Sequence, residues 1–206
     1  MIVIKMMTVS ATLAIALLTA QNSLAQAVVG KPAPAFSATD TSGKQVSLAQ
    51  LRGKLVVLEW TNPGCPFVGK HYDSGNMPAT QKHAIAKGAT WVSIQTGISD
   101  DTKARSQLQS WQKAKGASPI LTIIDSDAKI AIAYRATTTP HMFIVNTKGV
   151  VVYAGAIDNK ASANPADIAT ATNYVTQAID EVVAGKAVSQ PVTKSYGCSV
   201  KYPARP

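Results

Sequence analysis

The sequence predicts one α/β domain built on a mixed central β-sheet flanked by helices, with an added C-terminal helix and tail. Short β-branched and aliphatic runs alternate with segments of helical periodicity, which is the order expected of parallel strands joined by crossover helices. Near residue 150, two strand-like runs flank an Asn-Thr-Lys-Gly turn and predict an antiparallel hairpin at the sheet edge. The 206 residues, 46% hydrophobic and 15% charged, suit one ordinary domain with extensions.

The first 27 residues have the pattern of a secretory signal peptide. Lys5 precedes an almost uncharged apolar run over residues 9–20, and Ala25-Gln26-Ala27 offers a small-x-small cleavage site. Because the run is too short for a comfortable membrane span, we expect a removed leader, no stable membrane insertion afterwards, and an exported protein, periplasmic or secreted. The chain then divides into the leader (1–27), a sheet domain (28–160) and a C-terminal helix and tail packed on that domain (161–206).

The strands are predicted from compact apolar runs. Before them, Pro32 and Pro34 forbid a helix over residues 28–36, which we expect to be an extended lead-in. A turn at Ser42-Gly43 leads to a short strand or turn over residues 46–51. The buried strands and the hairpin strands are then expected at residues 54–60, 90–95, 120–124, 142–145 and 150–154.

The helices are predicted from caps and periodicity. Pro66 suits the first turn of a helix that runs to about residue 72. Further helices are expected at residues 77–87, from a cap at Ser99 or Asp100 to about residue 115, and at 128–134. One last continuous helix begins after the cap Asn164, has Asp167 in the capping-box place and ends at Gly185. Its apolar stripe comprises Ile168, Ala171, Val175, Ile179 and Val182.

Charge and cysteine content exclude several classes of function. The formal net charge is +9, but the lysines are scattered without interleaved aromatics, so we expect a basic soluble surface and no nucleic-acid partner. Two cysteines make no disulfide framework and no cluster typical of structural zinc, so neither a cofactor nor a bound metal is predicted. The pair is open to three interpretations: a structural staple, a redox pair or two separate thiols. The oligomeric state stays open.

Cys65 is the candidate nucleophile. It lies between a predicted core strand and the helix that Pro66 begins, and a helix N-terminus favours the reactive thiolate through its free N–H donors and partial positive charge. Lys70 and His71, one to two turns along, could add positive charge. A cysteine in such a turn is not expected to be buried deeply, and the alternative is a buried, inert thiol.

Three motifs in register resemble the redoxin branch of the thioredoxin superfamily, the alkyl hydroperoxide reductase/thiol-specific antioxidant-like proteins. They are Trp60-Thr61-Asn62-Pro63-Gly64-Cys65-Pro66-Phe67-Val68, Thr138-Thr139-Pro140 before a strand, and the hairpin from Gly149 to Gly155. The resemblance covers about residues 28–158 and implies a thioredoxin-like three-layer fold with Cys65 as the nucleophilic thiol. The tail over residues 196–201 is similar to that of a subgroup of exported redoxin-like proteins.

The resemblance also implies roles for three further residues. The Thr139–Pro140 bond would be cis and face Cys65, leaving the Thr139 backbone free to pair with a bound peptide or thiol substrate. The alternative is an ordinary trans proline at a strand start. Glu59 lies six residues before Cys65, where thioredoxins carry a buried acid that shuttles protons for the second thiol. Its alternative is a strand-end glutamate that reaches solvent or Lys54.

The sequence departs from the family pattern at the second thiol and at the peroxide-binding residues. Thioredoxin-type reductases use Cys-x-x-Cys, but here the second position is Val68. Peroxiredoxins carry proline and threonine seven and three residues before the cysteine, where this chain has Leu58 and Asn62, and the family arginine would fall near Pro140. Thr61, Asn62 and Arg135 could substitute, but fast peroxidase chemistry is not favoured.

Cys198 could complete the redox cycle. It lies in the aperiodic basic tail, which could return beyond the last helix and bring this thiol to Cys65. Cys198 would then resolve an attacked or oxidised Cys65 as a disulfide. A static bridge that ties down the tail, or no bridge at all, are the alternatives.

The leading functional hypothesis is an exported thiol–disulfide oxidoreductase or thiol-dependent antioxidant, with protein or small-molecule thiols and disulfides as partners. The second is a peroxiredoxin-like peroxidase acting on peroxides. The third is a non-enzymatic thioredoxin-fold protein that binds a partner or handles copper through Cys65 and His141, with Met142 or His71. Otherwise His71 and His83 are interpreted as surface helix positions and His141 as a strand start.

Overall fold

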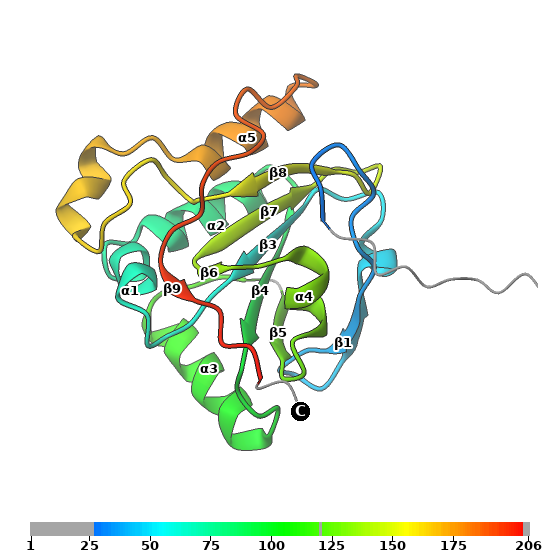
Figure 1. Cartoon of the computed structure of the whole chain (residues 1–206), viewed down its shortest axis with the longest axis vertical. Helices are drawn as coiled ribbons and strands as arrows, with labels where there is room; N and C mark the ends of the chain where they lie inside the picture. The colour runs from blue at the N-terminus through cyan, green and yellow to red at the C-terminus, as the bar shows by residue number, and fades with distance from the viewer. Residues whose placement is uncertain (1–26, 120, 204–206) are drawn as a thin grey trace, which may run out of the picture.

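The computed structural model describes residues 27–119 and 121–203, so the predicted leader lies outside the described residues except for Ala27. A five-stranded sheet forms the centre (Figure 1). Strand β3 runs parallel to β4, and β4 to β5, whereas β7 is antiparallel to both β3 and β8. The mixed sheet confirms the predicted α/β class. In spatial order the strands are β5 (Leu121–Asp125), β4 (Thr90–Thr96), β3 (Val56–Trp60), β7 (His141–Val145) and β8 (Val151–Gly155).

Helices cover both faces of the sheet, and β3 shows why. Its side chains alternate between two hydrophobic clusters, with Leu58 in one and Val57 in the other, and all five residues of the strand are buried. The first cluster is closed by α4 and the 3₁₀ helix η1, and the second by α1, α2 and α5, with Trp111 of α3 at its margin. These helices are η1 (Leu48–Leu51), α1 (Pro66–Asp73), α2 (Asn76–Ala86), α3 (Thr102–Ala114), α4 (Lys129–Tyr134) and α5 (Tyr174–Val183). None of the described helices has the length and apolar character needed to cross a membrane.

The N-terminal part adds a short hairpin of which the sequence predicts only one strand. β2 (Gln45–Ser47) falls in the expected region, but its partner β1 (Ser37–Thr39) is not among the predicted strands. Three residues, Ser-Ala-Thr, are too few to show a period-two apolar pattern, so the pairing with β2 is what defines this strand. The cap of α3 is also one residue later than expected, because Asp101 accepts the Ala104 N–H bond at 2.8 Å.

The prediction of one continuous C-terminal helix is wrong. The chain forms a 3₁₀ helix, η2 (Pro165–Thr170), and then a separate α5. Ala171 is extended, and the Asn159 side chain accepts the Thr172 N–H bond at 2.9 Å, so this N–H donates outside the helix. Asn173 then caps α5 by accepting from Thr176 N–H. The apolar periodicity of the sequence continues through Ala171 and Thr172, but the backbone there is not helical and the Thr172 N–H donates to the Asn159 side chain.

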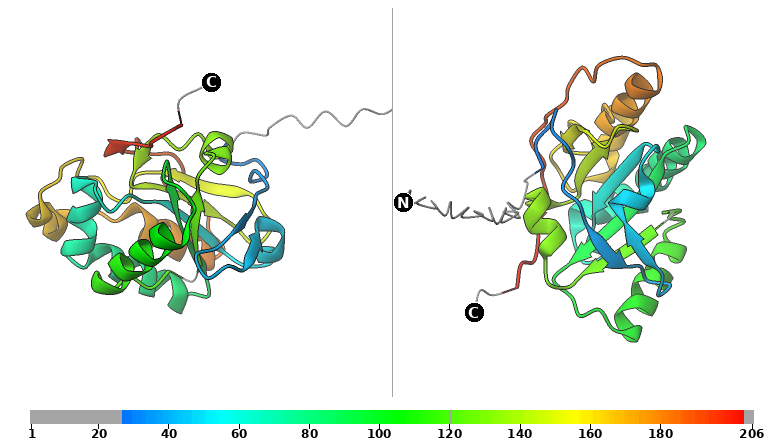
Figure 2. Two further views of the ribbon diagram at one scale, coloured as in Figure 1. Left: turned by 90° about the horizontal axis from the view of Figure 1, so that it is seen from below. Right: turned by 90° about the vertical axis from the view of Figure 1, so that its right-hand side faces the viewer.

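The tail crosses the molecule from α5 to the sheet end that carries the site (Figure 1, and from two other sides in Figure 2). It first pairs with β8, where Ala154 N–H donates to Pro191 and Thr193 N–H donates to Ala154. Gly155 permits this approach, because its φ is +154° and a Cβ there would lie 2.5 Å from the Thr193 carbonyl oxygen. Farther on, β9 (Cys198–Ser199) pairs antiparallel with β6 (Thr138–Thr139). The aperiodic tail is therefore ordered by backbone bonds to the domain.

Candidate active site

Cys65 lies at the N-cap of α1, directly after the turn that leaves the carboxyl end of β3. Its backbone is extended, Pro66 follows in the first helical turn, and the Cys65 carbonyl accepts the Gly69 N–H bond at 2.8 Å. The thiol donates to the Thr139 carbonyl at 3.1 Å. Cys65 therefore has both the helix N-terminus expected of it and a contact with the segment before Pro140.

The Thr139–Pro140 peptide bond is cis, as predicted. Thr139 is buried and forms half of the two-residue strand β6. Its carbonyl faces the Cys65 thiol, while its backbone is also the partner of Cys198 in the β6–β9 pair. The substrate-pairing edge that the family resemblance implied is occupied by the protein's own tail.

The tail places the second thiol beside the first. Cys198 pairs with Thr139 in register, the Thr139 carbonyl accepts from the Cys65 thiol, and each of the two free thiols shifts the pKa of the other. The preceding Gly197 has a φ of +131°, and a Cβ on it would lie 2.1 Å from the Thr139 carbonyl oxygen. Only glycine fits between Tyr196 and Cys198 without moving the tail. The two thiols are therefore neighbours, as both the redox pair and the structural staple left open by the sequence require.

The two thiols differ in acidity. Burial alone would raise the pKa of Cys65, but hydrogen bonds with Cys198, Thr139 and the Val68 backbone outweigh it and lower that pKa below the ordinary thiol value. For Cys198, burial, its hydrogen bond to Cys65 and the negative charge developing on Cys65 raise the pKa to about 11. Cys65 is therefore the more acidic thiol of the pair and Cys198 the less acidic one, which is the order that attack by Cys65 requires.

Replacing Cys198 with alanine is expected to raise the pKa of Cys65, since the thiolate loses its hydrogen-bond donor. Titrating the ultraviolet absorbance of the thiolate, with Cys65→Ser as background, measures this pKa without requiring a reagent to enter the site. Cys198→Ser keeps an O–H donor and should give a smaller rise. An unchanged pKa in Cys198→Ala would contradict the assignment of the bond.

Two expectations about the surroundings of Cys65 are wrong. The cysteine is only 2% exposed, because Tyr196 and Cys198 of the tail pack against the cluster that contains it. His71 is not a surface position but fully buried, and burial lowers its pKa to about 4. A neutral imidazole adds no positive charge toward Cys65, so the helix N-terminus and the hydrogen bonds have to stabilise the thiolate.

Lys70 and His71 instead enter a buried polar cluster that sequence reasoning missed. Lys70 forms an ion pair with Asp158 at 3.5 Å and donates to the Lys160 carbonyl at 2.7 Å. Tyr196 donates to the other oxygen of Asp158. The acid follows a buried apolar run and the tyrosine lies in an aperiodic tail, so nothing in their spacing signals that they meet.

Glu59 is fully buried on the same side of the sheet as Cys65, beneath α1 and α2. One carboxylate oxygen accepts from the Tyr72 hydroxyl at 2.7 Å, and the other accepts from Trp91 at 2.8 Å and Ser93 at 2.9 Å. Gln81 adds a fourth bond. Among the described residues no hydrogen bond joins Glu59 to either cysteine. Its alternative as a solvent-reaching strand end is wrong, and its role as a proton shuttle stays a prediction.

Glu59→Gln is expected to change the pH dependence of stability. Burial raises the pKa of Glu59, although its four hydrogen bonds oppose this rise. Its folded pKa therefore exceeds the unfolded value of 4.5, so its stabilising contribution is complete below pH 4.5 and is lost as pH rises through the folded pKa. The variant should lack this decline in urea-unfolding free energies measured across the range.

Glu181→Gln provides a control of opposite sign. Hydrogen bonds from Ser189 hold the pKa of Glu181 below its usual value, so this acid contributes stability above its unfolded pKa and loses it as pH falls. Identical pH profiles for wild type and Glu59→Gln would contradict the raised pKa.

Of the residues that could substitute for peroxidase groups, Thr61 and Asn62 lie in the turn before Cys65, and Arg135 lies at the end of α4. Leu58 points into the hydrophobic cluster on the opposite face of the sheet. The Asn62 side chain accepts from Gly64 N–H within the turn, and Arg135 is exposed at the end of α4. His141, proposed for copper, is buried with its Nδ1 accepting from Thr137 N–H. In the described part of the chain, no group of three or more His, Cys, Asp or Glu side chains could hold a metal ion.

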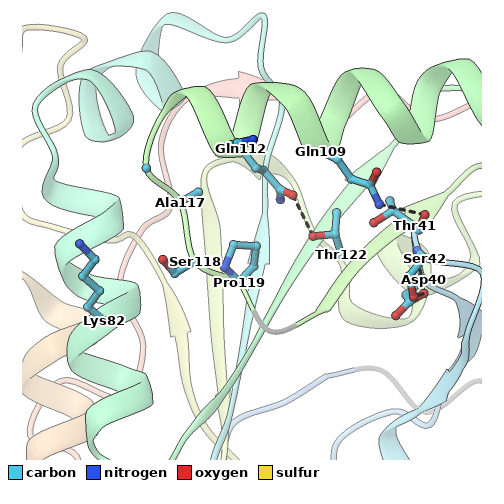
Figure 3. Close-up of a pocket in the computed structure, with 12 residues that line it drawn as sticks. Asp40, Thr41, Ser42, Lys82, Gln109, Gln112, Ala117, Ser118, Pro119 and Thr122 are labelled. Carbon is cyan, nitrogen blue, oxygen red and sulfur yellow. Dashed lines mark hydrogen bonds between the residues drawn. The ribbon is translucent and has the colours of Figure 1, made fainter.

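A polar hollow of about 500 Å³ lies away from these groups (Figure 3). It is lined by α3 side chains such as Gln112, the Asp40 turn and residues 116–119 before β5. Because β3 and β5 run the same way, this hollow is at the amino end of β5, whereas Cys65 follows the carboxyl end of β3. The hollow therefore takes no part in the thiol site.

The AhpC/TSA family model matches residues 29–154. The chain is 28% identical over 124 residues to the thiol-disulfide oxidoreductase ResA of Bacillus subtilis, covering 60% of this chain and 64% of that protein. It is 27% identical over 138 residues to the thiol:disulfide interchange protein DsbE of Yersinia pestis, covering 66% of this chain and 68% of that protein. The chain thus spans less than two thirds of the length of the Bacillus relative.

Solved structures are similar over most of the chain. An uncharacterized conserved protein from Geobacillus kaustophilus has a TM-score of 0.71 at 23% identity, covering 87% of this chain and 94% of that one. A hypothetical protein from Sinorhizobium meliloti has a TM-score of 0.66 at 24% identity, covering 86% and 96%. The thioredoxin domain of a Bacteroides vulgatus thiol-disulfide oxidoreductase has a TM-score of 0.52 at 19% identity, covering 69% and 96%. These similarities confirm the thioredoxin-like fold.

Proposed function

Because the chain belongs to the AhpC/TSA family, we propose that it is an exported thiol–disulfide oxidoreductase in which Cys65 attacks and Cys198 resolves. The observation that carries this proposal is that Thr139 brings the two cysteines together at the N-terminus of α1: its carbonyl accepts from the Cys65 thiol at 3.1 Å, and it pairs with Cys198 in the β6–β9 ladder. The pKa of Cys65 is lowered there and that of Cys198 is raised. The names of the two curated relatives support disulfide exchange, and the leader pattern of residues 1–27 supports export.

In the first step the Cys65 thiolate attacks one sulfur of a substrate disulfide. The substrate S–S bond breaks, a mixed disulfide forms at Cys65, and the leaving sulfur departs as a thiolate that takes up a proton. The Thr139 carbonyl accepts from the Cys65 thiol before this step, and Cys198 donates to the thiolate. The helix N-terminus and the hydrogen bond from Cys198 favour the reactive thiolate.

In the second step Cys198 attacks the Cys65 sulfur. The mixed disulfide breaks, the second half of the substrate leaves as a thiol, and the Cys65–Cys198 disulfide forms. Two of the effects that raise the pKa of Cys198 are its hydrogen bond to Cys65 and the negative charge on the Cys65 sulfur. Both are lost once Cys65 is part of a disulfide. Cys198 is therefore easier to deprotonate after the first step than before it. An external dithiol, or two monothiols in succession, then reduces the protein disulfide and is itself oxidised to a disulfide. Run in reverse, the cycle oxidises a substrate dithiol.

The proposal is tested with oxidised glutathione as a small disulfide. Reduced protein is mixed with it, the reaction is quenched with acid, and peptides are mapped without reduction. We expect a Cys65–glutathione mixed disulfide first and a Cys65–Cys198 disulfide afterwards. Both cysteines remaining free, or glutathione attached only to Cys198, would overturn the proposal. A parallel arm with stoichiometric hydrogen peroxide should form the same disulfide more slowly, and a faster reaction there would favour the peroxidase alternative.

A further inference from the structure

The buried polar cluster holds the tail two residues before Cys198. Its members outside the tail are Lys70, His71 and Asp158, whose side chains are 0% exposed. The Tyr196 hydroxyl enters the cluster from the tail and is the one group in it that bonds all three. Burying three titratable side chains is costly unless their polar atoms are satisfied. The tyrosine hydroxyl supplies one of those partners.

The hydrogen bonds in the cluster are mutually consistent. Asn76 donates to Nδ1 of His71 at 2.8 Å, so a neutral His71 carries its proton on Nε2. Nε2–H then donates to the Tyr196 oxygen at 3.0 Å, and the Tyr196 hydroxyl donates to Asp158. Lys70 lies 3.5 Å from the same hydroxyl and 5.4 Å from the centre of the tyrosine ring. The Tyr196 hydroxyl is thus satisfied both as a donor and as an acceptor.

The cluster ties the tail to the helix that carries the nucleophile. Lys70 and His71 belong to α1, and Cys65 is the N-cap of the same helix. The ring of Tyr196 also packs against Phe67 of α1, with ring centres 6.0 Å apart. From Tyr196 the chain crosses the Thr139 carbonyl at Gly197 and reaches Cys65 with the next side chain. The position of Cys198 is thus fixed on both sides, by the tyrosine before it and by the β6 pairing.

We propose that Tyr196 is a positioning residue for the second step, and this inference rests on the proposed function. Its hydroxyl keeps Cys198 at a high local concentration beside Cys65. In wild type Cys198 is already positioned beside Cys65 before the second step, because the bonds from Tyr196 to Asp158 and His71 offset the entropy cost of ordering the tail. The tyrosine hydroxyl bonds Lys70, His71 and Asp158, not a reacting sulfur, and it acts through the tail backbone.

The test separates the two steps in Tyr196→Phe. Reduced protein and oxidised glutathione are mixed, and acid-quenched samples give the rate of mixed-disulfide formation at Cys65 and the rate of its resolution by Cys198. Loss of a hydrogen bond to a charged group should slow resolution by about tenfold. Mixed-disulfide formation should be unchanged or faster, because a looser tail covers Cys65 less. General destabilisation of the fold would not separate the two rates in this way.

Two further variants make the result decisive. Tyr202→Phe is the matched control. This tail tyrosine also donates through its hydroxyl, in its case to the backbone carbonyls of Ala131 and Ala136, but it lies beyond Cys198. It should leave both rates unchanged. Gly197→Ala removes no side chain of the cluster but forces the tail off Thr139, so it should slow resolution as Tyr196→Phe does. It gives a second measurement should Tyr196→Phe fail to fold.

The outcomes distinguish this inference from the proposed function. If wild type forms no Cys65–Cys198 disulfide, the proposed function fails and the role of Tyr196 fails with it. If wild type forms the disulfide and folded Tyr196→Phe resolves at the wild-type rate, only the positioning role is overturned. Equal slowing of both steps would also overturn it, because it would show a general effect on the site.

Discussion

Replacing Cys198 with alanine is expected to stop the cycle after its first step. Cys65 keeps its place at the N-terminus of α1 and can still attack a disulfide, although its pKa rises. The mixed disulfide then has no thiol beside it and must wait for one from solution. Because a well-oriented intramolecular thiol acts at an effective concentration far above that of a free one, the release of the second product should slow by about a hundredfold or more.

Mass spectrometry of the intact, acid-quenched protein checks this result. Cys198→Ala should accumulate one glutathione per chain, on Cys65, whereas wild type passes through this species. Cys65→Ser is the matched control and should take up no glutathione at comparable speed, because Cys198 lies in the short strand β9 and lacks the helix N-terminus that favours a thiolate at Cys65. Release of the second product at the wild-type rate from Cys198→Ala would show that an external thiol resolves Cys65.

The largest loss of stability is expected for Asp158→Ala. The substitution removes the partner of Lys70 while the ammonium group stays fully buried, and it also removes the acceptor of the Tyr196 hydroxyl. Breaking a buried ion pair at one side leaves an uncompensated charge and costs about 3–5 kcal/mol. Chemical unfolding measured against urea should show this loss in the free energy of unfolding.

Asp180→Ala is a control of the same chemistry on the surface. Asp180 also pairs with one histidine and one lysine, His83 at 2.9 Å and Lys87 at 3.2 Å, but its side chain is 45% exposed. An exposed pair of this kind contributes at most about 1 kcal/mol. Equal losses in the two variants would show that the cluster around Lys70 is solvated in solution.

Local sequence signals determine much of the fold and the first half of the site. The aliphatic run into β3, the turn and Pro66 predict a strand followed by a helix, and this order alone places Cys65 at a helix N-terminus. The cis bond at Pro140 came from the family resemblance, and the structure confirms it. These features depend on residues that are neighbours in the chain.

The second half of the site could not be predicted because it depends on contacts between distant segments. Asp158 and Lys70 are 88 residues apart, and Tyr196 and His71 are 125 apart. Two consecutive polar residues on a helix, Lys70 and His71, are typical of a solvent-facing surface, and only the arrival of the tail makes that surface an interior. The break after η2 was missed for a similar reason, since the Asn159 side chain that takes the Thr172 N–H comes from outside the helical segment.

The pairing of β9 with β6 has a consequence for the size of acceptable substrates. An extended polypeptide that would align with Thr139 meets an intramolecular competitor, which is present once per molecule and cannot be diluted. The apparent affinity for such a polypeptide equals the intrinsic affinity multiplied by the fraction of molecules in which that edge is vacant. A compact disulfide that needs only the sulfur of Cys65 is disfavoured less. Under the proposed function, this competition would bias the protein toward small or weakly structured disulfides, and toward polypeptides able to displace its own C-terminal strand.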